Sequence, residues 1–306
     1  MITRKKVGQF IIIILFHYIL LSQQSFSSEY DLPDIEKSYF SIYYSPDRSW
    51  IALTNSNYTT LEIMNQEMSK SIKVPIPFLN TFNIKWSPDS DKLLLLRSRY
   101  NNKRRSNSLI VINRDGDLLE TIVDFTNQNL SPLGWTGNNT LHYLDAEEFV
   151  TYTLKGSDIE WGYPLVYAVN NKLFKKVNNR SHDLLFTADN TILNVSSSKY
   201  GNVVAFEIYG SSIIIIDNLR MATSELKMGN RPKVFPDGGM VTFMVLEDDG
   251  YQITKGDIFI WNAITKDTKP VANDPDLIEM NPVWYSNELV SYIIYPSGFI
   301  ETISIE

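Results

Sequence analysis

One turn recurs along this 306-residue chain and limits what the chain can fold into. It consists of an aromatic residue, a Pro-Asp pair and a following apolar strand, and it occurs at 44–47, 86–89 and 235–238. Proline sets the backbone at the second position of a tight turn, while Asp and then Gly suit the next two positions. Each copy therefore predicts a short antiparallel hairpin. In the first two copies Arg48 and Ser90 stand where glycine would be preferred.

Weaker copies of this unit begin near Trp135, Val195 and Trp284, so that six anchors follow one another at intervals of about 40 to 60 residues. Short runs rich in Ile, Val, Leu and aromatic residues lie between the turns, and no helical periodicity is seen after residue 30. A strand repeat of this length predicts an all-β β-propeller with four-stranded antiparallel blades. We expect six blades. Seven is the alternative, because extra sequence lies at 158–189 in the longest interval.

The second repeat shows the expected blade best. Its strands are predicted at 82–86, 93–96, 109–112 and 118–123. The last repeat ends after a third strand at 299–305, which would leave an open sheet edge. We therefore expect residues 35–40 to supply the missing strand and close the ring.

The first residues have the organisation of a secretory signal peptide. Basic residues at 4–6 precede an apolar run at 10–21 and small polar residues at 22–28. A membrane span needs about 20 apolar residues, so we expect cleavage after residue 27 rather than a retained anchor. Residues 28–306 then form a single propeller domain in the periplasm, with secretion as the alternative location.

Composition excludes several classes of function. The formal net charge is −7, which argues against nucleic acid or an anionic membrane as the main partner. The chain has no cysteine, which excludes thiol catalysis and thiolate metal sites. Hydrophobic residues make up 43% of the sequence, so the chain can bury a large core by packing alone.

Few residues offer catalytic or metal chemistry. After the leader, the histidines are His142 and His182, and two imidazoles do not complete a closed metal site. Segments 113–117 and 247–250 look like calcium loops but lack the distal glutamate, so we interpret them as turns. We predict no catalytic residue, no cofactor and no metal site. The aromatic segment 161–164 is interpreted as irregular core packing, with a peptide or carbohydrate groove as the alternative.

The strongest departure from the acidic average is the segment 97–105, which we expect to be a loop between the second and third strands of its blade. Its candidate binding residues are Arg97, Arg99, Tyr100, Lys103, Arg104 and Arg105. Guanidinium groups present forks of donors that match carboxylates and phosphates. The segment is therefore interpreted either as a solvated loop or as a binding loop for a carboxylate, a phosphate or an acidic protein patch.

The aromatic-Ser-Pro-Asp turn with its following strand resembles the TolB-like, WD-type propeller repeat of bacterial periplasmic proteins. The clearest copies are 86–89 with 93–96, and 235–239 with 241–243. The resemblance implies the propeller only, because TolB carries an additional N-terminal α/β domain. Ser98-Arg99 is similar to a Ser-x-Arg pair that such repeats carry after the second strand, which implies a partly structural role for Arg99. Prolyl-oligopeptidase relatives add a hydrolase domain, but this chain has no Gly-x-Ser-x-Gly elbow.

These observations favour an exported, noncatalytic propeller scaffold that works as a monomer and has no stable membrane span. Its expected partner is an envelope or extracellular protein, with a peptide or a glycan as alternatives. The alternative function is a glycoside hydrolase or lyase that uses carboxylates in the central channel. Two carboxylates that converge in a dry pocket would favour the enzyme.

Overall fold

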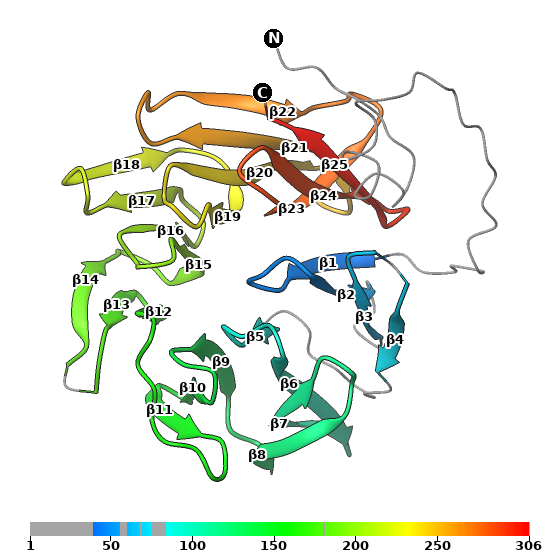
Figure 1. The fold of residues 1–306 in the computed structure, drawn as a ribbon. Coiled ribbons are helices and arrows are strands. Elements are labelled where there is room, and N and C mark those ends of the chain that lie inside the picture. The colour runs from blue at the N-terminus through cyan, green and yellow to red at the C-terminus, as the bar shows by residue number, and fades with distance from the viewer. Residues whose placement is uncertain (1–38, 56–59, 68, 75–83, 180, 306) are drawn as a thin grey trace.

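The computed structural model describes residues 39–55, 60–67, 69–74, 84–179 and 181–305 (Figure 1). The predicted signal peptide and the first part of the predicted closing strand, residues 35–38, lie outside these ranges. The secondary structure of the described residues is all β, as predicted. Nothing in these ranges forms an apolar helix of membrane-spanning length.

Figure 1 shows the strands arranged as sheets around a ring, and five of these sheets are separate antiparallel blades. Three of the five have four strands each: β1 (Tyr39–Tyr44), β2 (Trp50–Asn55), β3 (Leu61–Asn65) and β4 (Ser71–Val74); β5 (Lys85–Trp86), β6 (Lys92–Asn101), β7 (Arg104–Asn113) and β8 (Leu118–Thr126); and β15 (Ile192–Ser197), β16 (Val203–Ile208), β17 (Ile213–Asp217) and β18 (Ala222–Leu226). The other two have three strands each: β9 (Leu130–Trp135), β10 (Thr140–Asp145) and β11 (Glu148–Thr153); and β12 (Leu165–Val169), β13 (Lys172–Lys176) and β14 (Asp183–Thr187).

The remaining strands of the described chain form one seven-stranded sheet. Its antiparallel parts are β19 (Asn230–Val234), β20 (Met240–Asp248), β21 (Ile253–Asn262) and β22 (Thr268–Ala272), followed by β23 (Ile278–Trp284), β24 (Leu289–Tyr295) and β25 (Phe299–Ser304). A single parallel pair, Gly256 with Ile278, joins the two parts. A Cβ atom on Gly256 would lie 2.7 Å from the backbone oxygen of Glu279, so glycine allows the close approach.

The predicted blade count was wrong, both as six and as seven four-stranded blades. Five blades are separate, two of them have three strands, and the last sheet contains two of the sequence anchors, Phe235 and Trp284. The extra sequence at 158–189, which suggested an additional blade, does form a sheet, β12–β14, although this sheet has no aromatic-Pro-Asp turn. Each anchor therefore marks a hairpin, but the number of anchors does not give the number of sheets.

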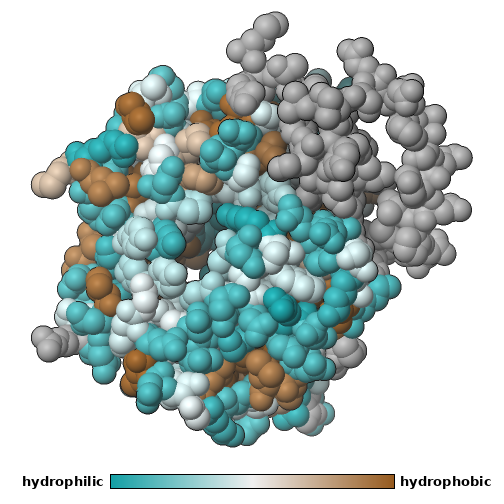
Figure 2. Space-filling model, viewed as in Figure 1, coloured by the Kyte–Doolittle hydropathy of each residue, from teal (hydrophilic) through white to brown (hydrophobic). Residues whose placement is uncertain are grey.

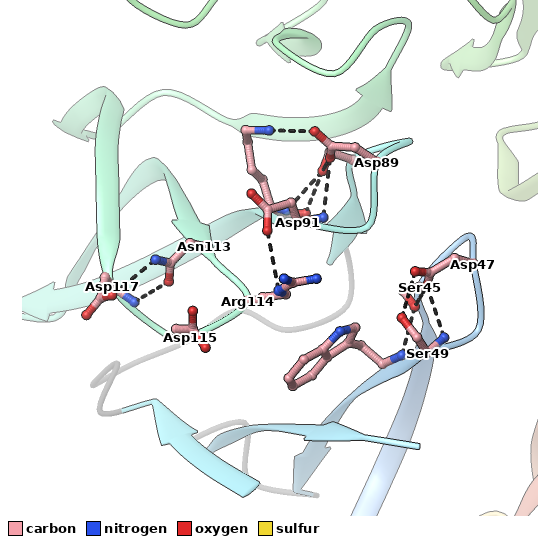
Figure 3. A network of polar contacts seen from close by, with 12 residues as sticks. Ser45, Asp47, Ser49, Asp89, Asp91, Asn113, Arg114, Asp115 and Asp117 are labelled. Carbon is pink, nitrogen blue, oxygen red and sulfur yellow. Dashed lines mark hydrogen bonds and ion pairs between the residues drawn. The ribbon is translucent and has the colours of Figure 1, made fainter. Parts of the chain in front are cut away.

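The turn itself has the predicted geometry (Figure 3). Ser45 Oγ donates to Asp47 Oδ1 over 2.6 Å and accepts the backbone N–H of Trp50 over 3.0 Å. Arg48 has a φ of 65° and Ser90 a φ of 62°, so both hold the left-handed conformation expected there. In the third copy Phe235 opens the turn, because its carbonyl accepts the N–H of Gly238 over 2.8 Å, and it thus takes the place of the serine.

Tryptophans at the ends of innermost strands join consecutive parts of the ring. Trp86 Nε1 donates to the carbonyl of Tyr43 over 2.9 Å, and Trp135 Nε1 donates to that of Lys85 over 3.0 Å. Trp284 Nε1 donates to the carbonyl of Lys233 over 2.7 Å. Each indole reaches the innermost strand before its own, which gives the aromatic anchors a structural role.

The core lies between adjacent sheets, and the same packing closes the ring. Ile42 and Leu53 of the first sheet pack in one buried cluster with Ile293 and Ile300 of the last. The prediction that residues 35–40 complete the last sheet was wrong for its described part. Residues 39 and 40 belong to β1, which pairs with β2 and is the strand of the first sheet that lines the channel. Within the described residues, the first and last sheets therefore meet through side-chain contacts and share no strand.

Candidate functional site

The basic segment 97–105 is a hairpin and not the predicted loop. β6 and β7 pair continuously as far as Asn101 and Arg104. Asn102 and Lys103 form the tip, with φ values of 47° and 64°, which suit a two-residue hairpin turn. A run of polar residues is typical of a loop. Here the same residues lie on paired strands, because this part of the hairpin extends beyond the hydrophobic core.

Two of the predicted binding residues stack on the fourth strand of the arm's sheet. The guanidinium carbon of Arg99 lies 4.1 Å from the centre of the Phe125 ring on β8, and that of Arg97 lies 4.8 Å from it. Arg97 Nε also donates to Ser108 Oγ over 3.2 Å. These contacts orient both arginines, which agrees with the partly structural role inferred for Arg99.

The base of the arm is fixed by buried polar contacts on its other face. Ser98 Oγ donates to Asn107 Oδ1 over 2.8 Å, and Asn107 Nδ2 donates to the carbonyl of Gln128 over 3.0 Å. Arg105 Nε donates to Ser98 Oγ over 3.1 Å. The hairpin is thus a braced arm, and its outer residues do not depend on a flexible loop for their position.

The outer residues of the arm are open to solvent. Tyr100 is 66% exposed, and Lys103, Arg104 and Arg105 are exposed as well. Within the described ranges, these three cations form no ion pair with a carboxylate. The structure therefore brings the predicted residues together as a cationic tip with an exposed aromatic ring.

A second candidate site is the channel along the ring axis, and Figure 2 shows one face hollowed at its centre. The channel contains a cavity of about 610 Å³. Its lining residues come from the innermost strands β1, β5, β9, β12, β15, β19 and β23. A cavity of about 790 Å³ continues it toward the ends of these strands, where Tyr44, Trp86, Trp135 and Trp284 form an aromatic mouth.

Three cations line the first cavity: Lys85, Arg231 and Lys233. No aspartate or glutamate is found among its described lining residues. Burial, together with the charges of Lys85 and Arg231, lowers the pKa of Lys233 to about 8, while Glu207 acts in the opposite direction. Burial also lowers the pKa of Lys85. Lys85 is half-buried and the Lys233 side chain is exposed, so both line the channel while water still reaches them.

A polar belt crosses the inner strands near these cations. Arg231 Nη1 donates to Asn281 Oδ1 over 2.8 Å, and Asn281 Nδ2 donates to the carbonyl of Phe40 over 2.7 Å. Asn194 Nδ2 donates to Glu207 Oε1 over 2.8 Å, and the backbone N–H of Arg231 donates to the same carboxylate. The belt connects successive parts of the ring and orients the Arg231 guanidinium.

Backbone bulges place the belt residues. Asn194, Arg231 and Asn281 have φ values of 50°, 51° and 55°, and each lies in a register shift of its innermost strand. A bulge turns one side chain away from the regular alternation. Neither these residues nor the two channel lysines were predicted from the sequence. The available signal was Lys85 and Lys233, each placed two residues before the residue that opens a repeat turn.

The histidines belong to packing between the sheets β9–β11 and β12–β14. His142 is fully buried and is hydrogen-bonded to Thr136 Oγ1 over 2.8 Å and Thr151 Oγ1 over 3.2 Å. His182 is hydrogen-bonded to Lys176 Nζ over 3.0 Å and to the hydroxyl of Tyr167. No three His, Cys, Asp or Glu side chains gather as a metal site in the ranges described above.

The other segments considered from the sequence have local structural roles. Trp161 packs on His142 with ring centres 5.1 Å apart, as the packing interpretation predicts. Asn113 and Asp117 are hydrogen-bonded to each other within their turn (Figure 3). Asp248 Oδ1 and Asp249 Oδ1 accept backbone N–H groups of their own turn, from Gly250 and Tyr251.

No protein-family model matches the sequence, and no curated protein matches it. Among solved structures, U3-55K is similar with a TM-score of 0.62 and 9% identity, over 88% of this chain and 96% of that chain. The β-propeller domain of Cps50 (Swd1) from Myceliophteria thermophila gives a TM-score of 0.59 and 12% identity, over 88% and 97% of the two chains. Hsv2 from Kluyvelomyces marxianus gives 0.57 and 12%, over 87% and 92%.

These structures are WD40-type β-propellers, and their likeness to this chain supports the propeller fold. At such low identity it shows the fold alone. The TolB-like family is not confirmed by these comparisons.

Proposed function

We propose that this protein is an exported, noncatalytic propeller scaffold whose basic hairpin binds an acidic segment of a partner protein. The observation that carries the proposal is the cationic tip: Lys103, Arg104 and Arg105 are exposed on a braced arm without carboxylate partners in the described structure. Carboxylates suit these donors, and Tyr100 adds an apolar surface beside them. Propellers of the WD40 type are protein-interaction scaffolds, which supports the same class of function.

Export to the periplasm is part of the proposal. It is supported by the basic, apolar and small-residue order of the first 28 residues. Amino-terminal sequencing of protein from the periplasmic fraction should find a mature start near Ser28. Recovery of the uncleaved chain from the cytoplasm would contradict export.

The geometry gives the enzyme alternative less support. A glycoside hydrolase or lyase acting in the channel would need a pair of carboxylates on the substrate. The described lining of the first cavity carries cations instead, and at the mouth the lining carboxylate is that of Asp47, which is held within its turn.

The hairpin proposal can be tested by site-specific photo-crosslinking in cells. With Tyr100→benzoylphenylalanine, we expect a crosslinked protein whose attachment site, read by mass spectrometry, lies in an Asp/Glu-rich segment. Arg104→Gln with Arg105→Gln should reduce the yield at least fivefold, and added salt should weaken the complex because the contacts are charged.

Tyr251 provides the matched control, because it is 99% exposed at the tip of another hairpin, next to Asp248 and Asp249. Tyr251→benzoylphenylalanine should not crosslink the same protein. Equal yields at the two tips, or a yield unaffected by the arginine substitutions, would contradict the proposal.

A further inference from the structure

The channel holds positive charge that the fold does not require. Lys85 on β5 and Lys233 on β19 each lie two residues before the residue that opens a turn, and Tyr43 and Val283 occupy this position on β1 and β23. Neutral side chains therefore fill the same place elsewhere in the ring. Within the described chain, neither lysine side chain has a hydrogen bond or an ion pair.

These cations lie close enough to act on one another. The charges of Lys85 and Arg231 oppose protonation of Lys233, and burial does so more strongly, which lowers the pKa of Lys233 to about 8. Glu207 offsets part of this, but its carboxylate also accepts hydrogen bonds from Asn194 and from the Arg231 backbone. Like charges held this close in one channel repel one another unless a negative group joins them.

The space and its donors suit a small ligand. The cavity of about 610 Å³ falls within the range of small-molecule sites, and the aromatic mouth gives a route of entry. The lysine ammonium groups supply movable donors. Arg231 supplies a planar fork that Asn281 holds from one side over 2.8 Å. Donors from two different strands can thus reach separate acidic groups of one molecule.

We propose that the central channel is a binding site for a small organic anion that carries two or more carboxylate or phosphate groups. Lys85, Lys233 and Arg231 bind the acidic groups, and Val166, Leu193 and Pro282 line the channel beside them. A multivalent anion matches this arrangement better than a single carboxylate, because it neutralises several cations that otherwise repel one another. The site is separate from the basic hairpin and does not depend on the function proposed for it.

Isothermal titration calorimetry of the full mature chain with citrate and with pyrophosphate tests this site. We expect one of the two probes to bind with a stoichiometry of one, and acetate to bind at least tenfold more weakly. Binding by citrate alone assigns a carboxylate ligand, whereas binding by pyrophosphate alone assigns a phosphate ligand. Lys233→Met and Lys85→Met should each weaken binding at least tenfold.

Lys172→Met is the matched control, because Lys172 lies exposed on β13 outside the cavity lining. It should leave the affinity unchanged. Each channel variant removes one of several cations that repel one another, so we expect it to fold and to melt no lower than the unaltered protein at pH 7. Failure of both probes to bind, or equal losses of affinity in Lys233→Met and Lys172→Met, would overturn the channel site. Neither result affects the crosslinking test of the hairpin.

Discussion

Asp47 shows why the recurring aspartate is a turn residue rather than a catalytic group. Burial by itself would raise the pKa of its carboxyl, but hydrogen bonds from Ser45, Ser49 and Ser90 outweigh burial and lower the pKa to about 2. A carboxylate whose oxygens accept these bonds is a weak base at neutral pH. The same geometry explains Asp89, whose pKa is also lowered, although burial again opposes the hydrogen bonds from Lys92 and Ser87.

His142 predicts a specific loss of stability in acid. Burial chiefly, with the charges of Lys176 and His182, lowers the pKa of His142 to about 3. An unfolded histidine titrates near 6.5, so between these values the unfolded chain binds a proton that the folded chain does not. The free energy of unfolding should therefore fall with decreasing pH, by about 3 kcal/mol between pH 6.5 and pH 4. Urea unfolding at several pH values measures this effect.

The variant His142→Gln isolates that contribution, because glutamine keeps a polar side chain but does not titrate. Its stability should depend less on pH than that of the unaltered protein over the same range. A ring resonance of His142 that titrates near pH 6.5 in the folded protein would show that the imidazole is not held neutral.

Hairpins are the elements from which this ring is built, and their turns differ in how tightly they are packed. Gly238 has a φ of 85°, and a Cβ atom there would lie 2.6 Å from Val203 Cγ2 of the neighbouring sheet. Gly210 has a φ of 72°, but no atom lies within 4 Å of the place of its Cβ. The two glycines share a backbone conformation and differ only in their surroundings.

These two positions give a paired prediction. Gly210→Ala should cost about 1 kcal/mol, because alanine is strained in the left-handed region. Gly238→Ala should cost about 1 to 3 kcal/mol more, since Val203 or the turn has to move. Chemical denaturation of both variants measures the difference. Equal losses of stability would mean that the repeat turn does not pack against the preceding sheet.

The whole ring depends on the contact between its first and last sheets. The hydroxyl of Tyr44 is hydrogen-bonded to Ser291 Oγ over 2.9 Å, and the ring of Tyr44 packs on Tyr285 with centres 5.3 Å apart. Ser291 is fully buried and is also hydrogen-bonded to Thr302 over 2.8 Å. These contacts join segments from opposite ends of the described chain.

Tyr44→Phe should therefore destabilise the protein by about 1 to 2 kcal/mol, because the buried Ser291 hydroxyl loses a partner while the ring packing is kept. Amide hydrogen exchange should become faster in both β1 and β24 and stay unchanged in β13. Tyr251→Phe, at a residue that is 99% exposed, serves as the neutral control. Faster exchange limited to β1 would show that the two sheets do not open together.

Local chemistry made the hairpins predictable. The left-handed residues Arg48 and Ser90 follow from the Pro-Asp turn, and the strands expected at 93–96 and 109–112 lie within β6 and β7. Propensity and side-chain alternation act over a few residues, and the sequence contains them directly. The place of the basic segment in the second repeat was also predictable, because the charged residues are read directly from the sequence.

Tertiary structure alone decided how the hairpins combine. The joining of β21 to β23 depends on Gly256 meeting a distant strand, and the sheet β12–β14 carries no repeat turn. The convergence of Lys85 with Lys233 likewise depends on contacts between residues that are remote in the chain. The turns could be predicted because they depend on neighbours in the chain. The sheet count and the channel could not, because they depend on residues that are distant in the chain and meet only in space.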